Sequence, residues 1–138
     1  MTEHRLTLHN DIGEIDLLPP FIEGICEVAG VDAETTMQLN LALEEAVSNV
    51  MLYAFPTGEV HIFELQCRVD KDCLSFEILD GGKAFDPTAH DDPDVTLSAE
   101  ERSIGGLGIF MVRQIMDEVR YERCDGKNRL TMIKNLKK

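Results

Sequence analysis

The chain has 138 residues, and a chain of this length can form one domain with its own hydrophobic core. Thirteen Lys and Arg stand against 26 Asp and Glu, a formal net charge of −13, which disfavours nucleic acid because phosphate binding needs clustered cations. No apolar run approaches the ~20 residues of a membrane span, and the N-terminus lacks the basic-then-apolar order of a signal peptide. A cytoplasmic protein without membrane contact is therefore expected.

The first half of the chain predicts one strand and two helices. Residues 4–9 alternate weakly between apolar and polar and indicate a short edge strand. A helix is predicted over 17–29, with its prolines confined to the first turn, where they are tolerated. Asp32 is a good N-cap for a long helix over 33–55. The apolar side chains of that helix share one face at helical spacing: Leu39, Leu43, Ala46, Val47, Val50 and Ala54.

The second half predicts two strand hairpins separated by a long acidic loop and a helix. In chain order these elements are 63–69, 74–78, 86–104 (the loop), 107–117 (the helix), 118–124 and 128–136. Loops of such length are usually functional lids or disordered. Strands that come in adjacent hairpins favour a largely antiparallel sheet. With three helices on one face, the expected fold class is an α+β two-layer sandwich.

The first candidate site is on the long helix. Glu45 and Asn49 are four residues apart, so they lie on one ridge of the helix surface. They lie away from the centre of the apolar stripe, on a mixed face that could line a cleft. Asn offers a neutral oxygen suited to Mg²⁺, and Glu one turn away could take a proton from a hydroxyl or a water. The alternative is a solvated Glu and Asn on an exposed helix.

The second candidate site is the Asp-Gly-Gly turn that ends the strand at 74–78. Asp80 has the strand parity of the buried apolar residues before it, which predicts that its carboxylate faces the apolar side. A buried carboxylate needs hydrogen-bond donors, and an adenine amino group would be one. Gly81 and Gly82 remove side chains where a flat ring must approach closely. The alternative is a plain turn with Asp80 satisfied by backbone.

The third candidate site is the glycine-rich start of the helix at 107–117. Glycines at a helix start leave backbone N–H groups free to face an anion, and the helix dipole favours that anion. Arg102, just upstream, could add a charge-assisted contact. The segment does not follow a strand, so it is neither a Rossmann turn nor a Walker loop. The alternative is a loop–helix junction with flexible glycines.

Together and in this order, the three segments resemble the N, G1 and G2 boxes of the GHKL ATPase superfamily, the Bergerat fold. The matching segments are 43–50, 80–87 and 104–116. Within the superfamily they are most similar to the small anti-sigma-factor serine/threonine protein kinases, over about residues 5 to 136. The resemblance implies a single domain over 1–138, with a largely antiparallel mixed sheet, helices on one face and an ATP lid at about 86–104. Ala84 departs from the family, which often has Gly or Pro there.

The resemblance also implies ATP and Mg²⁺ as cofactors and assigns roles to individual residues. Glu45 would be the general base that activates a partner's serine, and Asn49 would hold Mg²⁺. Asp80 would bind the adenine amino group, with Thr131 beside it on a late strand, and Gly82 would make room for the base. The remaining contacts would be to phosphate, from backbone N–H groups and one side chain: Gly105, Gly106, Leu107 and Gly108 through their amides, and Arg102 at the terminal phosphate.

Three functions are compatible with these residues. In the first, the chain is a kinase that phosphorylates an anti-sigma-factor antagonist and sequesters a sigma factor or similar regulator, and family members of this kind often form homodimers. In the second, it is a non-catalytic, nucleotide-gated protein-binding regulator, an alternative favoured by the acidic lid and by Ala84. In the third, it is a histidine-kinase catalytic domain, which is disfavoured because the chain has no room for a dimerising helical hairpin with a phospho-accepting His.

Overall fold

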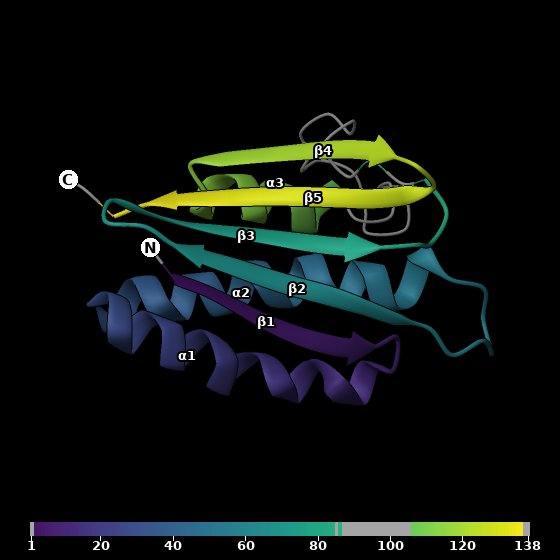
Figure 1. Cartoon of the computed structure of the whole chain (residues 1–138), viewed down its shortest axis with the longest axis horizontal. Helices are drawn as coiled ribbons and strands as arrows, with labels where there is room; N and C mark the ends of the chain where they lie inside the picture. Colours follow the sequence, from purple (N-terminus) through teal and green to yellow (C-terminus); the bar gives the residue numbers. More distant parts are fainter. Residues whose placement is uncertain (1, 85, 87–105, 137–138) are drawn as a thin grey trace.

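The computed structural model describes residues 2–84, 86 and 106–136, so the predicted lid lies outside the described residues except for Asp86. Five strands form one sheet in the order β1-β2-β3-β5-β4 (Figure 1). Their bounds are Thr2–His9 (β1), Ile62–Val69 (β2), Cys73–Asp80 (β3), Glu118–Cys124 (β4) and Lys127–Asn135 (β5). All four described pairings are antiparallel. The predicted antiparallel character is confirmed, and nothing in the described sheet makes it mixed.

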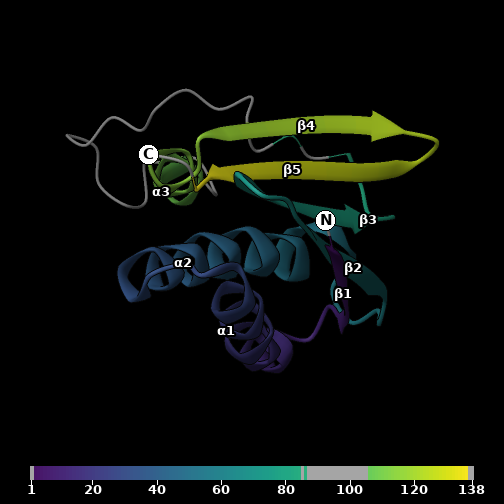
Figure 2. The ribbon, with the colours of Figure 1, turned by 60° about the vertical axis from the view of Figure 1, so that its left-hand side comes forward.

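The helices lie on one face of this sheet, with α2 between α1 and α3 (Figure 2). Their bounds are Leu18–Ala29 (α1), Ala33–Asn49 (α2) and Gly106–Ile115 (α3), and a 3₁₀ helix over Ile12–Leu17 precedes α1. The predicted α+β two-layer sandwich is therefore confirmed. Among the described helices, none combines the length and the apolarity needed to cross a bilayer.

The long helix begins as predicted and ends differently. The Asp32 carboxylate accepts a hydrogen bond from the Thr35 backbone N–H at 2.7 Å, which caps α2. The prediction of one α-helix over 33–55 is wrong at its C-terminal end, because Val50–Ala54 forms a π-helical turn. The physical reason is tertiary: the Ala54 carbonyl accepts a hydrogen bond from the Lys83 backbone N–H at 2.9 Å, outside the helix.

The core lies between the helical layer and the inward face of the sheet. Strand periodicity puts Leu74, Phe76 and Ile78 of β3 on that face, where all three are buried. Their cross-strand neighbours on β5 include Leu130 and Met132, which are also buried. Asp80, the last residue of β3, has the same strand parity, so its carboxylate also faces inward, at the edge of the core.

The β4–β5 hairpin determines which side chain faces Asp80. Asp125 and Gly126 have φ angles of 52° and 76°, the two positive values that a type I′ turn requires. This tight turn makes Cys124 and Lys127 partners in the ladder, and the register then aligns Asn128 with Asp80 on β3. Asn128 is consequently an inward-facing residue at the end of the sheet where β3 finishes.

Candidate functional site

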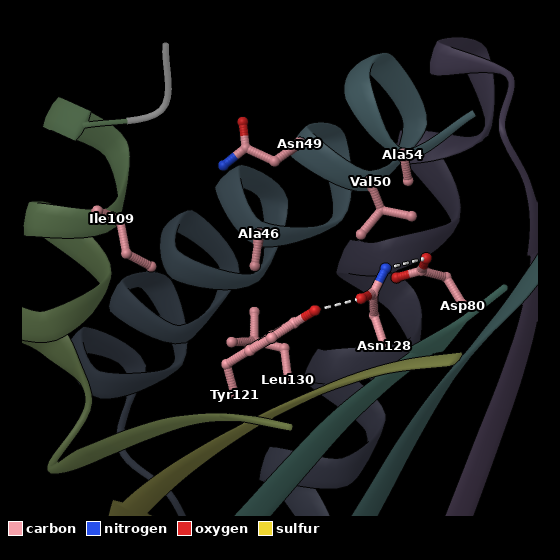
Figure 3. A pocket seen from close by; sticks show the side chains of 9 residues that line it. All are labelled: Ala46, Asn49, Val50, Ala54, Asp80, Ile109, Tyr121, Asn128 and Leu130. Carbon is pink, nitrogen blue, oxygen red and sulfur yellow. Dashed lines mark hydrogen bonds between the residues drawn. The ribbon is translucent and has the colours of Figure 1, made fainter. Parts of the chain in front are cut away.

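A small cavity lies between α2, α3 and the end of the sheet (Figure 3). It encloses about 30 Å³, room for about two water molecules. Its lining combines apolar side chains with four polar ones: Ala46, Asn49, Val50, Ala54, Asp80, Ile109, Tyr121, Asn128 and Leu130. Asp80 at the end of β3 and Ile109 in α3 therefore face the same space, although they are far apart in the sequence.

Asp80 is the charged group of this cavity. It is only 6% exposed, and its Oδ1 accepts hydrogen bonds from the Gly82 backbone N–H and from the Asn128 amide, each at 2.9 Å. Among the described residues, its second oxygen, Oδ2, accepts no hydrogen bond. A buried carboxylate with one oxygen satisfied and one available is an acceptor for a ligand that carries an N–H group.

Asn128 is a site residue that the sequence reasoning missed. It is 4% exposed, and Figure 3 shows its amide between Tyr121 and Asp80. Its Oδ1 accepts hydrogen bonds from the Tyr121 hydroxyl and from the Arg123 guanidinium. A signal for it was present: Asn128 has the inward strand parity of Leu130, and a polar residue at an apolar-face position needs buried partners.

Thr131 does not lie beside Asp80, so this prediction is wrong. In the sheet register Thr131 lies opposite Glu77 on β3 and opposite Arg120 on β4. Because side chains alternate along a strand, a residue three positions after Asn128 points to the opposite face of the sheet. The cross-strand neighbour of Asp80 is Asn128, and Thr131 lies on the face away from the helices.

Glu45 lies half-buried on α2, against the start of α3. Burial, reinforced by repulsion from Glu44, raises the pKa of the Glu45 carboxyl above its usual range. A Cβ atom placed on Gly108 would come within 1.7 Å of Glu45 Oε1. The Glu45 side chain therefore occupies the space that any side chain at position 108 would take. Two residues 63 positions apart in the sequence thus form one contact between α2 and α3, next to the cavity-lining residues Ala46 and Ile109 in the chain.

Asn49 is one turn after Glu45 on α2 and lines the cavity. Figure 3 shows its amide group near the first turns of α3, on the opposite side of the cavity from Tyr121. An amide oxygen at this place is a suitable ligand for a hard cation such as Mg²⁺. The Asp80 carboxylate and the Asn49 amide oxygen therefore fit a ligand that offers an N–H group to Asp80 and carries a cation toward Asn49.

Gly82 packs against the end of the π-helical turn. A Cβ atom on Gly82 would lie 2.3 Å from the Ala54 carbonyl oxygen. The absent side chain thus makes room for the end of the π-helical turn. The Arg123 guanidinium donates to the Gly82 carbonyl at 2.8 Å, so this turn is held from both sides.

The remaining predicted phosphate contacts are described only in part. Arg102 and Gly105 lie outside the described residues. Gly106, Leu107 and Gly108 form the first turn of α3. The first backbone N–H groups of a helix have no partner within it, so this turn can donate to an anion.

Comparison with known proteins identifies relatives over most of the chain. The model of the family "Histidine kinase-like ATPase domain" matches residues 12–134. The serine/threonine-protein kinase BtrW of Bordetella bronchiseptica is 33% identical over 100 residues, which cover 72% of this chain and 70% of that protein. The serine-protein kinase RsbW of Listeria monocytogenes is 31% identical over 109 residues, covering 76% and 69%. The Staphylococcus epidermidis RsbW is 27% identical over 133 residues, covering 90% and 80%.

Solved structures share the fold at lower identity. The RsbU and RsbW domains of a Mycobacterium tuberculosis protein match with a TM-score of 0.68 and 14% identity, over 99% of this chain and 33% of that one. The histidine kinase domain of a blue-light-activated kinase from Erythrobacter litoralis matches with a TM-score of 0.59 and 17% identity, over 88% and 60%. The predicted resemblance to GHKL ATPases and their serine-kinase branch is thereby confirmed. The chain belongs to the histidine kinase-like ATPase domain family.

Proposed function

We propose that this chain is an ATP-dependent serine/threonine protein kinase. The observation that carries the proposal is the half-buried carboxylate of Glu45. This residue lies on α2, its side chain contacts the start of α3, and it is one helical turn from the cavity-lining Asn49. The sequence likeness to serine-protein kinases supports the same activity. A carboxylate with a raised pKa beside a candidate cation ligand suits proton transfer from a hydroxyl.

In this proposal the cavity binds the nucleotide. Asp80 Oδ2 accepts the adenine amino group, and the backbone N–H groups at the start of α3 bind phosphate. Asn49 would hold Mg²⁺, and the ion would supply positive charge to neutralise the phosphates. The family resemblance assigns further phosphate contacts to the Arg102 side chain and the Gly105 amide.

The cavity must widen before a purine can enter. Its present volume of about 30 Å³ holds about two water molecules. One described wall is the π-helical turn Val50–Ala54, and π-helical turns occur frequently at functional sites. We therefore assign the widening to this turn, which rests on Gly82 and on the Lys83 backbone N–H.

Glu45 acts on the protein substrate. The serine oxygen of the substrate attacks the γ-phosphorus, the bond from that phosphorus to the β–γ bridging oxygen breaks, and ADP leaves with that electron pair. Glu45 orients the hydroxyl and takes its proton. Positioning and charge stabilisation supply most of the rate, because phosphoryl transfer needs little covalent help from the protein.

The partners proposed are proteins in the cytoplasm. The substrate is an anti-sigma-factor antagonist, and a sigma factor or similar regulator is the sequestered partner, as the resemblance implies. A homodimer is the proposed assembly. The net charge of −13 favours protein partners over nucleic acid or anionic membrane surfaces.

The test is phosphotransfer from labelled ATP, with Mg²⁺, to the antagonist protein encoded beside this chain in the genome. We expect transfer by the wild type, and a loss of about 10²- to 10⁴-fold in Glu45→Ala with ATP affinity largely kept. Glu44→Gln, assayed at a pH above the acid limb of the pH profile, is the matched control, since it changes the adjacent, exposed carboxylate of the same helix. Full transfer by Glu45→Ala, or ATP binding by the wild type without any transfer, contradicts the proposal.

A further inference from the structure

We propose that Asn128, held by Tyr121 and Arg123, is a positioning residue that makes the site prefer adenine over guanine nucleotides. The inference rests on the proposed ATP-binding function and goes beyond it, because it assigns base preference to three residues of the β4–β5 hairpin. Asn128 and Tyr121 line the cavity together with Asp80. All the contacts involved lie among the described residues.

The orientation of the Asn128 amide is determined by its four hydrogen bonds. Its Nδ2 donates to Asp80 Oδ1 at 2.9 Å and to the Lys83 carbonyl at 2.8 Å. Its Oδ1 accepts from the Tyr121 hydroxyl and from Arg123 Nη1, the latter at 3.1 Å. An amide has two N–H groups and two lone pairs, so every one is used. Turning the amide over would set donor against donor and acceptor against acceptor.

This arrangement leaves Asp80 with one oxygen for a ligand. The Asn128 amide and the Gly82 backbone N–H both donate to Oδ1, so the carboxyl group is held through that oxygen. Oδ2 is then presented to the cavity as an acceptor. Adenine carries an amino group where guanine carries a carbonyl oxygen. The fixed carboxylate thus attracts one base and repels the other.

Asn128 also separates Asp80 from a cation. Arg123 donates to Asn128, and Asn128 in turn donates to Asp80, so the amide stands between the guanidinium and the carboxylate. Without the amide, the guanidinium becomes free to pair with Asp80 directly. A bidentate Arg–carboxylate pair would use both carboxylate oxygens. The acceptor for the base would be lost even though Asp80 itself remained.

Asn128, Tyr121 and Arg123 should contribute unequally to the preference for adenine. Tyr121→Phe removes one donor to Asn128 and keeps the ring that lines the cavity. Arg123 also donates to the Gly82 carbonyl, so its removal loosens the 81–83 turn as well. Asn128→Leu keeps a side chain of similar size and removes all four hydrogen bonds. Asn128→Leu is therefore the decisive variant, and Tyr121→Phe is the mild one.

The experiment measures the dissociation constants of Mg-ATP and Mg-GTP for the full chain by calorimetry. We expect the wild type to prefer ATP by at least about tenfold. In Asn128→Leu the affinity for ATP should fall by about 10- to 100-fold while that for GTP changes little. The ratio of the ATP affinity to the GTP affinity (the ATP/GTP ratio) should therefore fall by the same factor. Tyr121→Phe should lower the same ratio by about threefold. Thr131→Val, on the opposite face of β5, is the matched control and should leave the ratio unchanged.

The outcomes separate this inference from the proposed function. A wild type that binds neither nucleotide overturns both. A wild type that binds ATP and transfers phosphate, with the same ATP/GTP ratio in wild type and Asn128→Leu, overturns the role of Asn128 alone. If Asn128→Leu melts before it can be measured, Tyr121→Phe decides: an unchanged ratio in that variant overturns the inference. A lower melting temperature with an unchanged ratio means that the amide is only structural.

Discussion

Glu45 has its carboxylate half-buried beside Gly108, with the like charge of Glu44 next to it in the chain. Burial and repulsion both disfavour the ionised form, which is why the pKa of Glu45 is raised. A general base works best when its pKa approaches the working pH. Because its position raises the pKa of Glu45 toward the working pH, the carboxyl group is better suited to the proposed role of general base.

The raised pKa predicts a shifted pH profile. The base must be ionised, so phosphotransfer falls as pH drops through the pKa of Glu45, and this fall begins at higher pH than for an exposed Glu. In Glu44→Gln the repulsion is gone, and the acid limb should move to lower pH. The check is kcat/KM for the antagonist protein between about pH 4.5 and about pH 8. An acid limb in the same place in both proteins would count against this prediction.

Gly108→Ala should displace the base without harming the fold. The new methyl group meets the end of the Glu45 side chain, which can turn away, and Ala is favoured over Gly in a helix by about 1 kcal/mol. We expect the melting temperature to hold and phosphotransfer to fall by about 10²-fold, because misplacing a catalytic group by about 1 Å is that costly.

The double variant Glu45→Ala/Gly108→Ala tests the cause of that loss. If the methyl group acts only through Glu45, the double variant loses no more activity than Glu45→Ala alone. Losses that add would mean that Gly108 acts on the phosphate side by itself.

At the scale of elements, the end of α2 and the turn after β3 form a single packed unit. The carbonyl of Ala54, at the end of the π-helical turn, accepts a hydrogen bond from the Lys83 backbone N–H. The same carbonyl lies where a Gly82 side chain would be. Arg123 from β4 holds the other side of the turn through the Gly82 carbonyl. A shift of the π-helical turn should therefore also move the 81–83 turn that follows β3.

Replacing Gly82 by Ala should destabilise this unit. A Cβ atom 2.3 Å from a backbone oxygen cannot be relieved by a side-chain rotation, so the turn or the end of α2 must shift. We expect a loss of about 1–3 kcal/mol in the free energy of unfolding, measured by urea titration, together with weaker ATP binding. Gly81→Ala is the matched control, because its Cβ atom meets nothing within 4 Å. Equal stability of the two variants would rule out this packing argument.

At the scale of the whole molecule, charge is the dominant feature. A net charge of −13 on 138 residues repels itself in the compact state. Ion pairs on the face of the sheet away from the helices, such as Arg68–Glu3 and Arg120–Glu118, are solvent-exposed and of small value. Repulsion should therefore outweigh them.

The nucleotide-free protein should accordingly be stabilised by salt. Raising NaCl from about 0.05 M to about 0.5 M shortens the screening length severalfold, and we expect a gain of about 1 kcal/mol, or about 3–5 °C in melting temperature. Differential scanning calorimetry measures the shift. A melting temperature that falls with added NaCl would mean that the ion pairs dominate.

Local periodicity allowed several features to be predicted. The two-residue alternation of β3 placed the Asp80 side chain on the buried face, and the 3.6-residue period of α2 put Glu45 and Asn49 on one ridge. The last hairpin, predicted from strands over 118–124 and 128–136, also forms. These predictions needed only interactions between near neighbours in the chain, so the amino-acid sequence alone carried them.

Other features depended on contacts between distant residues. Asn128 lies 48 positions from Asp80, and only the strand register shows that it, and not Thr131, is the neighbour of that carboxylate. Gly82 and Gly108 are required by Ala54 and Glu45, which no local pattern reveals. The sequence by itself determined the order and inward faces of the strands and α-helices, since those follow from short-range periodicity, but not the π-helical turn that ends α2. The tertiary structure alone decided which polar groups meet, because that depends on register and on helix packing across the whole chain.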